Sequence, residues 1–419
     1  MLSKPTKVLL VVLLAAAGAI HLWSRRQAAE EMAIPEDAYP PGRWTRVGPT
    51  GEGADLAQVL SLPYLQGKIE AGETSGVTRH DPERAHPGAN LYCSGHGPEA
   101  ILMDMEGRPL HRWRFRFRDA FPEARRIQES AFFRRVALLP GGDLLALFHG
   151  TGLIKLDRDS NLLWAAPVKA YNDFFIESDG RILVLHKEAR VVPEVRADEP
   201  VLEDFIAELT PDGELLGRAS LLGAFLTPPW DPLLASPSDE ADLLHSNTIT
   251  RLDGSAAETA AGEPFTPGNL LVSLRNVDVL GVLDPAGSEV LWGRRGAWKA
   301  QHEPVLLANG NLLLFDNKGG PDDGTRVIEV EPASGDVVWS YGDGEGEALF
   351  SPEGGTVARL PNGNTLITAS ESGRVIELTD DGEIVWEYLS PHRAGPDNEL
   401  VATIWEVQRI ELDELAWLP

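Results

Sequence analysis

The sequence has very little cysteine, and it has fewer basic than acidic residues. Cys93 is the one cysteine among 419 residues, so an internal disulfide cannot form, and no Cys-x-x-Cys pair exists to hold a structural zinc ion of the usual kind. Lysine and arginine number 37 against 64 aspartates and glutamates, a formal charge of −27. Such a surface repels nucleic acid and anionic lipid, so the composition argues against a role on DNA or RNA. We expect Cys93 to be a small buried residue.

Long apolar runs are confined to the start of the chain. Lys4 and Lys7 precede an apolar stretch at 8–23, whose 16 residues fall short of the roughly 20 that an ordinary transmembrane helix needs. The small residues at 17–19 suit a signal-peptidase site, whereas the tryptophan and arginines that follow suit an uncleaved anchor. We therefore predict that residues 1–26 are a signal peptide or signal anchor. Either form places the remainder outside the cytoplasm, in the periplasm, attached to the inner membrane if the segment is not cleaved.

Residues 27–89 are rich in proline, glycine and acidic side chains and show weak periodicity. We predict a mostly irregular lead segment with one short helix near 56–65.

Beyond residue 90 the sequence repeats itself, which indicates a repeat architecture. Each unit reads as short strands separated by Asn-Gly, Asp-Gly or similar turns, which favour hairpins because they tolerate positive φ. Clear copies lie at 136–167, 304–342 and 357–388, and weaker copies lie at 174–218, 249–292 and 99–113. The closing strand of four copies carries a tryptophan: Trp164, Trp292, Trp339 and Trp386.

The last part of the chain offers a way to close a ring. Residues 402–411 read as a strand without a hairpin partner in its own repeat, and the copy at 99–113 lacks its first strands. A C-terminal strand that completes the first unit removes the exposed edges of a linear stack. We predict an all-β fold, a six-bladed β-propeller at 90–411, followed by a tail at 412–419.

Polar residues stand just before the first strand of several repeats, and in a propeller these positions converge on one mouth of the central channel. His245 and Asn247 occupy these positions in one repeat, and Gln301 and His302 occupy them in another. A lone histidine at a strand start is usually a satisfied core or edge residue. Two histidines at one phase of a repeat favour a functional site, so we expect His302 to face the channel.

Several motifs resemble the bacterial arylsulfate sulfotransferases. They are "LLHSNTITRLDG", "SLRN" with Arg294 eighteen residues after Asn276, "QHEPVLLANGNLLLFDN", "TR" at 325–326, "FSPEGG" and "LPNGNTLI". The resemblance covers roughly 90–390 and implies an export-targeted six-bladed propeller that moves a sulfuryl group from an aryl sulfate to a phenol through a sulfohistidine. It implies no nucleotide donor and no cofactor.

The same resemblance implies roles for individual residues. His302 corresponds to the nucleophile, His245 to a second active-site histidine and Arg294 to the active-site arginine. The sequence also departs from the family, because Asn276 stands where better-known members have a histidine. The lead segment is too short for their N-terminal β domain, and one cysteine cannot form their disulfide.

The chemistry of sulfuryl transfer explains why such residue types would be needed. A loose, anionic transition state requires a neutral nucleophile, fixed positive charge and a proton donor or acceptor. Neutral imidazole suits His302, and Arg294 and Arg275 can bind sulfate oxygens. His245 can protonate the leaving oxygen or accept the proton of the acceptor. Further predicted substrate-binding residues are Asn247, Asn276, Asn317 and Arg326.

Alternatives remain for individual residues and for the class of protein. Arg294 could be half of a solvated arginine pair, and Arg326 could simply pair with Asp322 or Asp323. The chain could be a non-catalytic extracytoplasmic propeller that binds a small anion or glycan. A quinone-dependent dehydrogenase would need a calcium-type acidic cluster, and a nucleotide-dependent sulfotransferase would need a phosphate-binding loop; neither is found in the sequence. We therefore expect small-molecule partners, an aryl sulfate and a phenol, with no metal.

Overall fold

The architecture is that of a computed structural model, which describes residues 67–124, 132–234, 241–254, 256, 262–344, 348–394 and 399–418. The signal segment predicted at 1–26 and the short helix predicted at 56–65 lie outside these residues. Within the described ranges, no helix is long and apolar enough to cross a membrane.

The regular secondary structure of the described chain is almost entirely β-strand, so the all-β prediction is confirmed. The first strands are β1 Gly67–Glu70, β2 Gly76–His80, β3 Ala89–Ser94, β4 Glu99–Met103, β5 Pro109–Arg114, β6 Arg135–Leu138, β7 Leu144–Phe148, β8 Gly152–Leu156 and β9 Leu162–Ala166. Next come β10 Ala170–Ile176, β11 Ile182–Val191, β12 Pro200–Leu209, β13 Leu215–Ser220, β14 Ser246–Arg251, β15 Leu270–Leu274, β16 Val279–Leu283 and β17 Val290–Arg295. The last are β18 His302–Leu306, β19 Leu312–Asp316, β20 Arg326–Val330, β21 Val337–Tyr341, β22 Thr356–Arg359, β23 Thr365–Ala369, β24 Arg374–Leu378, β25 Ile384–Leu389, β26 Arg393–Ala394, β27 Leu400–Ala402 and β28 Ile404–Ile410. Two short helices, α3 Phe117–Ala120 and α4 Leu221–Phe225, lie between strands.

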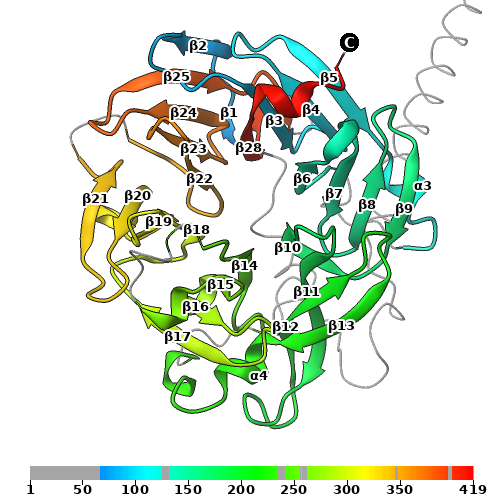
Figure 1. Cartoon of the computed structure of the whole chain (residues 1–419), viewed down its shortest axis with the longest axis vertical. Helices are drawn as coiled ribbons and strands as arrows, with labels where there is room; N and C mark the ends of the chain where they lie inside the picture. Colours follow the sequence, from blue (N-terminus) through cyan, green and yellow to red (C-terminus); the bar gives the residue numbers. More distant parts are fainter. Residues whose placement is uncertain are drawn as a thin grey trace, which may run out of the picture. The chain divides into compact units, whose positions relative to one another are not determined.

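These strands form antiparallel sheets arranged as a propeller-like ring (Figure 1). The four-stranded sheets of the described chain have the orders β28-β3-β4-β5, β6-β7-β8-β9, β10-β11-β12-β13, β14-β15-β16-β17 and β18-β19-β20-β21. A five-stranded sheet has the order β2-β25-β24-β23-β22, and a small one has the order β1-β27-β26. Figure 1 shows β28, β6, β10, β14, β18 and β22 nearest the centre of the ring.

The middle strands of the sheets are apolar, as expected for strands that are packed on both faces. Every residue of β7, β15, β16 and β19 is buried, whereas β13 at the outer edge of its sheet is mostly exposed. The turn between β18 and β19 uses Gly310 at φ +87°, a conformation that glycine adopts without steric cost. In the outermost strands tryptophan reaches the next sheet: Trp164 Nε1 donates to the backbone oxygen of Pro211 at 3.1 Å.

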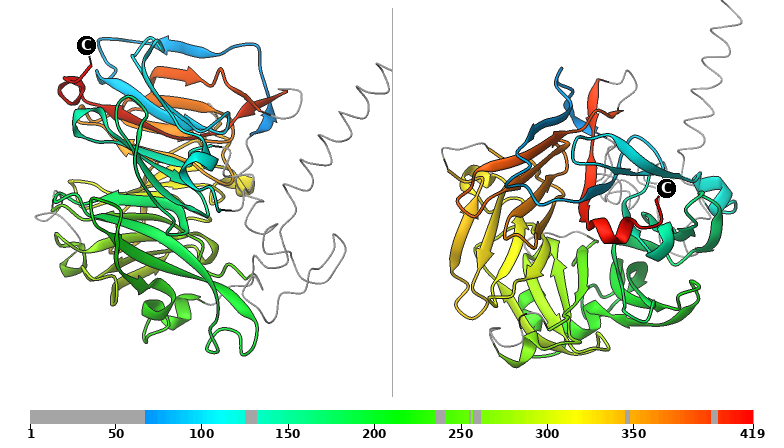
Figure 2. Two further views of the ribbon diagram at one scale, coloured as in Figure 1. Left: turned by 90° about the vertical axis from the view of Figure 1, so that its right-hand side faces the viewer. Right: turned by 45° about the horizontal axis from the view of Figure 1, so that its top comes forward.

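The two ends of the described chain meet in one sheet. β28 pairs with β3, with Ile410 opposite Ala89 and Ile404 opposite Ser94, and Figure 2 shows the red C-terminal strand beside the blue and cyan ones. Trp405 in β28 is fully buried and stacks on Phe132 at 5.3 Å between ring centroids. The ring is therefore closed by the C-terminal strand.

The described part of the lead segment contains two short strands that were not predicted. In residues 67–89, β1 pairs with β27 and β2 pairs with β25, and the residues between these strands lie outside regular structure. The first repeat also has a strand that sequence reasoning missed, β3, which supplies the partner of β4. The pairings of β1 and β2 join segments more than 300 residues apart, so no local pattern marks them. Cys93 lies in β3 and is buried, as predicted.

An ion cluster links first strands across the centre of the ring. Arg135 in β6 pairs with Asp173 in β10 at 2.7 Å, with Glu303 in β18 at 2.9 Å and with Glu406 in β28 at 3.2 Å. Burial, only partly offset by Arg135, raises the pKa of Asp173 to about 7. One arginine thus ties together strands from four sheets.

Candidate active site

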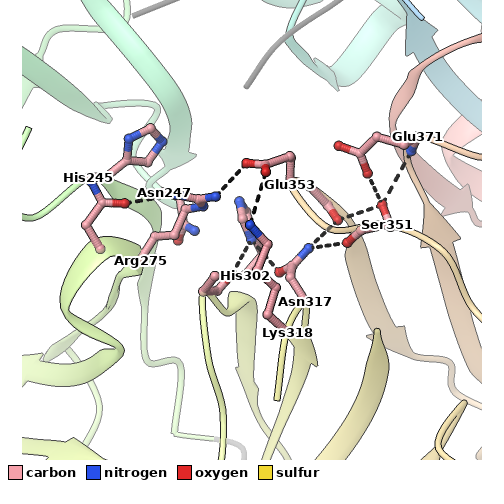
Figure 3. Close-up of polar contacts among 12 residues, drawn as sticks. His245, Asn247, Arg275, His302, Asn317, Lys318, Ser351, Glu353 and Glu371 are labelled. Atoms are coloured by element: carbon pink, nitrogen blue, oxygen red, sulfur yellow. Dashed lines mark hydrogen bonds and ion pairs between the residues drawn. The ribbon is translucent and has the colours of Figure 1, made fainter. Parts of the chain in front are cut away.

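Polar side chains gather where first strands begin and second strands end. His245 immediately precedes β14 and His302 begins β18, while Arg275 follows β15 and Asn317 follows β19. Because adjacent strands run antiparallel, the end of each second strand lies beside the start of the first. The topology therefore brings these four side chains to the same end of the ring (Figure 3).

His302 is buried, and its two ring nitrogens differ. Nδ1 lies 2.7 Å from Asn317 Oδ1 and 3.1 Å from the backbone oxygen of Ala300. Asn317 Nδ2 donates to the backbone oxygens of Ser351 and Gly354 at 2.6 and 2.7 Å, so its Oδ1 is an acceptor and Nδ1 of His302 must carry the proton. Nε2 then holds the lone pair, and it has no hydrogen-bond partner among the described residues.

The environment of His302 keeps the imidazole neutral. Burial, with the nearby Arg275 as the next cause, holds the pKa of His302 well below its usual range. The expectation that this histidine lies open to the channel is wrong, because the residue is only 3% exposed. Side chains from neighbouring sheets surround His302. Its Nε2 is therefore buried and has no hydrogen-bond partner among the described residues, whereas the prediction was a side chain open to the channel.

Two cations and one carboxylate stand next to His302. Arg275 Nη2 lies 2.5 Å from Glu353 Oε2, and Lys318 Nζ lies 3.1 Å from Glu353 Oε1. Figure 3 shows the carboxylate between the two cations, beside His302 and Asn317. Arg275 Nε is buried and has no hydrogen-bond partner among the described side chains, so this arginine retains a donor for an anion.

His245 is held by a buried carboxylate. Its Nδ1 lies 2.6 Å from Asp242 Oδ2, and Lys187 Nζ lies 2.7 and 2.8 Å from the two oxygens of the same carboxylate. Burial favours the neutral form of Asp242, but Lys187 and His245 outweigh it and hold the pKa of Asp242 well below its usual value. Burial and then Lys187 lower the pKa of His245 to about 4, so it rests as neutral imidazole with its proton on Nδ1.

The backbone is strained at this end of the ring. His245 and Ala300 adopt φ values of +47° and +54°, and Glu303 adopts +48°. Such left-handed conformations in residues other than glycine are uncommon and often mark functional sites. Here the left-handed residues change the direction of the chain at the starts of β14 and β18, where the two histidines stand.

The predicted asparagines lie in the site, but they bind the backbone. Asn247 Nδ2 donates to the backbone oxygen of Gln301 at 2.8 Å, and Asn276 Nδ2 donates to that of Asp242 at 2.6 Å. Buried backbone oxygens at strand ends need partners, and short amide side chains supply them. These residues therefore position the segments that carry His302 and His245, and their role as direct substrate ligands is not supported.

Arg294, predicted to be catalytic, lies elsewhere. It stands on β17, the outermost strand of its sheet, and donates to the backbone oxygens of residues 332–334, with Nη1 reaching that of Ala333 at 2.8 Å. An arginine at the rim cannot reach groups at the start of the first strand. The prediction is wrong, and Arg275, at the end of the second strand, takes the place expected for Arg294.

Arg326, predicted to bind substrate, has a structural role. Its Nε lies 2.8 Å from Asp316 Oδ2, and its Nη2 donates to the backbone oxygen of Ala297 at 2.6 Å. The alternative prediction was an ion pair with Asp322 or Asp323, whereas the partners in the structure are Asp316 and Asp343.

Several members of the site were missed from the sequence: His149, Lys187, Asp242, Lys318 and Glu353. His149 and Lys318 follow second strands, and Lys187 lies within one. The ends of second strands, where Arg275, Asn276 and Asn317 also stand, are the signal that points to His149 and Lys318. Burial, followed by the charges of Arg134 and Lys187, holds the pKa of His149 well below its usual range. The described residues contain no group of three or more His, Cys, Asp or Glu side chains suited to a metal ion.

Comparison with known proteins identifies the family. The arylsulfotransferase (ASST) family profile matches residues 135–391, more than half of the sequence. The chain belongs to the arylsulfotransferase family, as the motifs predicted. This membership supports, at the level of the family, an aryl sulfotransferase enzyme with small-molecule substrates.

Solved structures with a similar arrangement are distant in sequence. A protein of unknown function from Bacteroides caccae shares 17% identity at a TM-score of 0.50, covering 78% of this chain and 99% of its own. Virginiamycin B lyase from Staphylococcus aureus shares 14% identity at a TM-score of 0.37, covering 63% and 71%. The WD40 β-propeller domain of Doa1 shares 12% at 0.42, covering 78% and 87%. The first of these likenesses concerns the fold alone. No curated protein matches the sequence significantly.

Proposed function

We propose that this protein is an aryl-sulfate sulfotransferase that transfers a sulfuryl group to a phenol through a sulfohistidine at His302, without a nucleotide donor. The observation that carries the proposal is the state of His302, whose proton is fixed on Nδ1 by Asn317 while Nε2 is neutral and unpartnered. A nucleophilic histidine needs this tautomer. The proposed fold is a six-bladed propeller with the site at one end of its channel.

In the first half-reaction, Nε2 of His302 attacks the sulfur of the aryl sulfate. A bond forms between nitrogen and sulfur, the bond between sulfur and the aryl oxygen breaks, and the phenolate leaves with that electron pair. Arg275 and Lys318 both pair with Glu353, which lies beside His302. They therefore lie where they can offset the negative charge on the sulfuryl oxygens.

In the second half-reaction, His245 acts as the general base. Its Nδ1 donates to Asp242, so its Nε2 carries the lone pair that takes the proton of the acceptor phenol as the phenol oxygen attacks sulfur. The bond between nitrogen and sulfur then breaks and restores neutral His302. Asp242 offsets the positive charge that develops on His245, and Lys187 fixes the carboxylate.

The alternative, a binding module that holds a small anion, shares the cations but gives no reason for the fixed tautomers. Kinetics separate the two proposals. With 4-nitrophenyl sulfate as donor and phenol as acceptor, the transferase should show parallel ping-pong lines and a rate that depends on phenol. Saturable binding of the donor with no transfer to phenol would favour the binding module.

The pH profile should have its acid limb far below the usual range of histidine. A folded-state pKa below the unfolded value of about 6.5 means that the neutral form is preferred in the fold, and protonation is resisted as pH falls. We expect acceptor turnover to fall only as pH approaches about 4, the pKa of His245. Lys187→Met removes a charge that lowers this pKa, so its acid limb should lie at higher pH. An acid limb near pH 6.5 in the unaltered protein would contradict the assignment.

The proposed location is extracytoplasmic, with the chain attached to the inner membrane if residues 1–26 remain. The support is Lys4 and Lys7 ahead of the apolar stretch, since positive charge is retained on the cytoplasmic side. A periplasm-dependent reporter fused after residue 40 should be active. A reporter that works only in the cytoplasm would contradict this location.

A further inference from the structure

Glu353 occupies the space between the two cations beside the proposed nucleophile. Its carboxylate lies 2.5 Å from Arg275 and 3.1 Å from Lys318, and its side chain is 22% exposed. One carboxylate against two cations leaves a single positive charge in this triad. The site proposed for an anion thus carries a resident negative charge that is not needed to attack sulfur.

The loop that carries Glu353 is fixed in place. Asn317 Nδ2 donates to the backbone oxygens of Ser351 and Gly354, at either side of Glu353, while its Oδ1 accepts from His302. Gly355 has φ +139°, and a Cβ added there would lie 2.5 Å from the ring of Phe315, so the chain passes close to the core. The carboxylate is therefore held next to His302 by its own ion pairs and by its backbone.

Other charged groups around the triad have their own partners. Lys187 is paired with Asp242, and Glu371 accepts a hydrogen bond from the hydroxyl of Ser351. Arg134 packs over the ring of Trp405, 4.7 Å from the ring centroid. The charge that an anion meets beside His302 therefore comes from Arg275, Lys318 and Glu353, with Arg134 as a further positive charge that acts on His302.

We propose that Glu353 is a specificity-determining residue that shifts the preference of this site away from doubly charged phosphate esters and towards singly charged sulfate esters. A sulfate monoester carries one negative charge, whereas a phosphate monoester carries two above its second pKa of about 6. Repulsion by a fixed carboxylate a few ångströms away grows in proportion to the charge of the ligand. The inference rests on the proposed function for its choice of ligand.

Binding of two unreactive isosteres tests the inference on the full chain. Phenylmethanesulfonate carries one negative charge, and phenylmethanephosphonate carries two at sufficiently high pH. Calorimetry at such a pH gives the ratio of the two affinities for the unaltered protein, against which the variants are compared. In Glu353→Gln the phosphonate should gain affinity at least about tenfold more than the sulfonate, because one unit of fixed negative charge is lost.

Two further variants guard the result. Glu188→Gln is the matched control, since Glu188 also bridges an arginine and a lysine, Arg218 and Lys169, with a side chain 25% exposed. Its ratio of the two affinities should not change. Lys318→Met lowers the charge of the triad, so it should weaken both ligands and favour the sulfonate further. Lys318→Met thus provides an independent test of how the charge of the triad affects the ratio of affinities if Glu353→Gln does not fold.

The inference is wrong if the ratio of affinities is unchanged in Glu353→Gln, or if the phosphonate loses affinity relative to the sulfonate. Absence of binding of either ligand to the unaltered protein would also contradict it. Failure of the transferase proposal is a separate result, because it would show as absence of a labelled His302 whatever the ratio of affinities. A shifted ratio without labelling would leave a sulfonate-selective binding site.

Discussion

Replacing His302 by alanine should reduce transfer from 4-nitrophenyl sulfate to phenol by about 10⁴-fold or more, since the atom that accepts the sulfuryl group is lost. The protein should still fold. His302 begins β18 and contributes little apolar contact, but its loss leaves Asn317 Oδ1 without a donor in a buried place. That loss costs about 1–3 kcal/mol of the free energy of unfolding.

Turnover by steady-state kinetics and thermal unfolding by circular dichroism should be measured together. Arg294→Ala is the control, because Arg294 lies on the outermost strand and binds the turn at 332–334. Its turnover should match that of the unaltered protein, with a loss of about 1 kcal/mol in stability. Equal turnover in His302→Ala would exclude His302 as the nucleophile.

Deleting residues 400–419 should prevent cooperative folding. The deletion removes β27 and β28, exposes the edge of β3, and removes the fully buried Trp405. Loss of one buried tryptophan side chain alone costs about 3–5 kcal/mol, while whole domains are stable by about 5–15 kcal/mol. The ion pair between Arg135 and Glu406 is lost as well.

Thermal unfolding of the purified variants measures this effect. Deletion of 412–419 alone is the matched control; it removes Trp417, which packs against Trp113 at 5.8 Å between ring centroids, but it keeps β28. The control should unfold cooperatively at a lower temperature. If the longer deletion melts cooperatively at an unchanged temperature, β28 does not hold the ring together.

Much of the fold could be predicted because each repeat is local. The hairpin turns, such as that at Gly310, and the buried strands lie within about forty residues of one another, so their pattern is visible in the chain. The pairings of β1 and β2 were not visible. Their partners β27 and β25 lie at the opposite end of the sequence, and short strands with mixed polarity resemble loops.

The site was predicted in part for the same reason. The phase of the repeat identified His245 and His302, because both stand at the start of a first strand. Arg294 was placed by its spacing from Asn276, but the intervening strand β16 carries the chain from the centre of the ring to its rim. Glu353 and Lys318 meet only because two sheets are adjacent in the ring, and that adjacency is not encoded by spacing.

The most direct measurement is the mass of the intact protein after reaction with 4-nitrophenyl sulfate in the absence of an acceptor. A covalent histidine intermediate predicts a gain of one sulfuryl group, located by fragmentation at His302, absent in His302→Ala, and removed when phenol is added. No gain in mass while phenol is still sulfated, or a gain that persists in His302→Ala, would contradict the proposed mechanism.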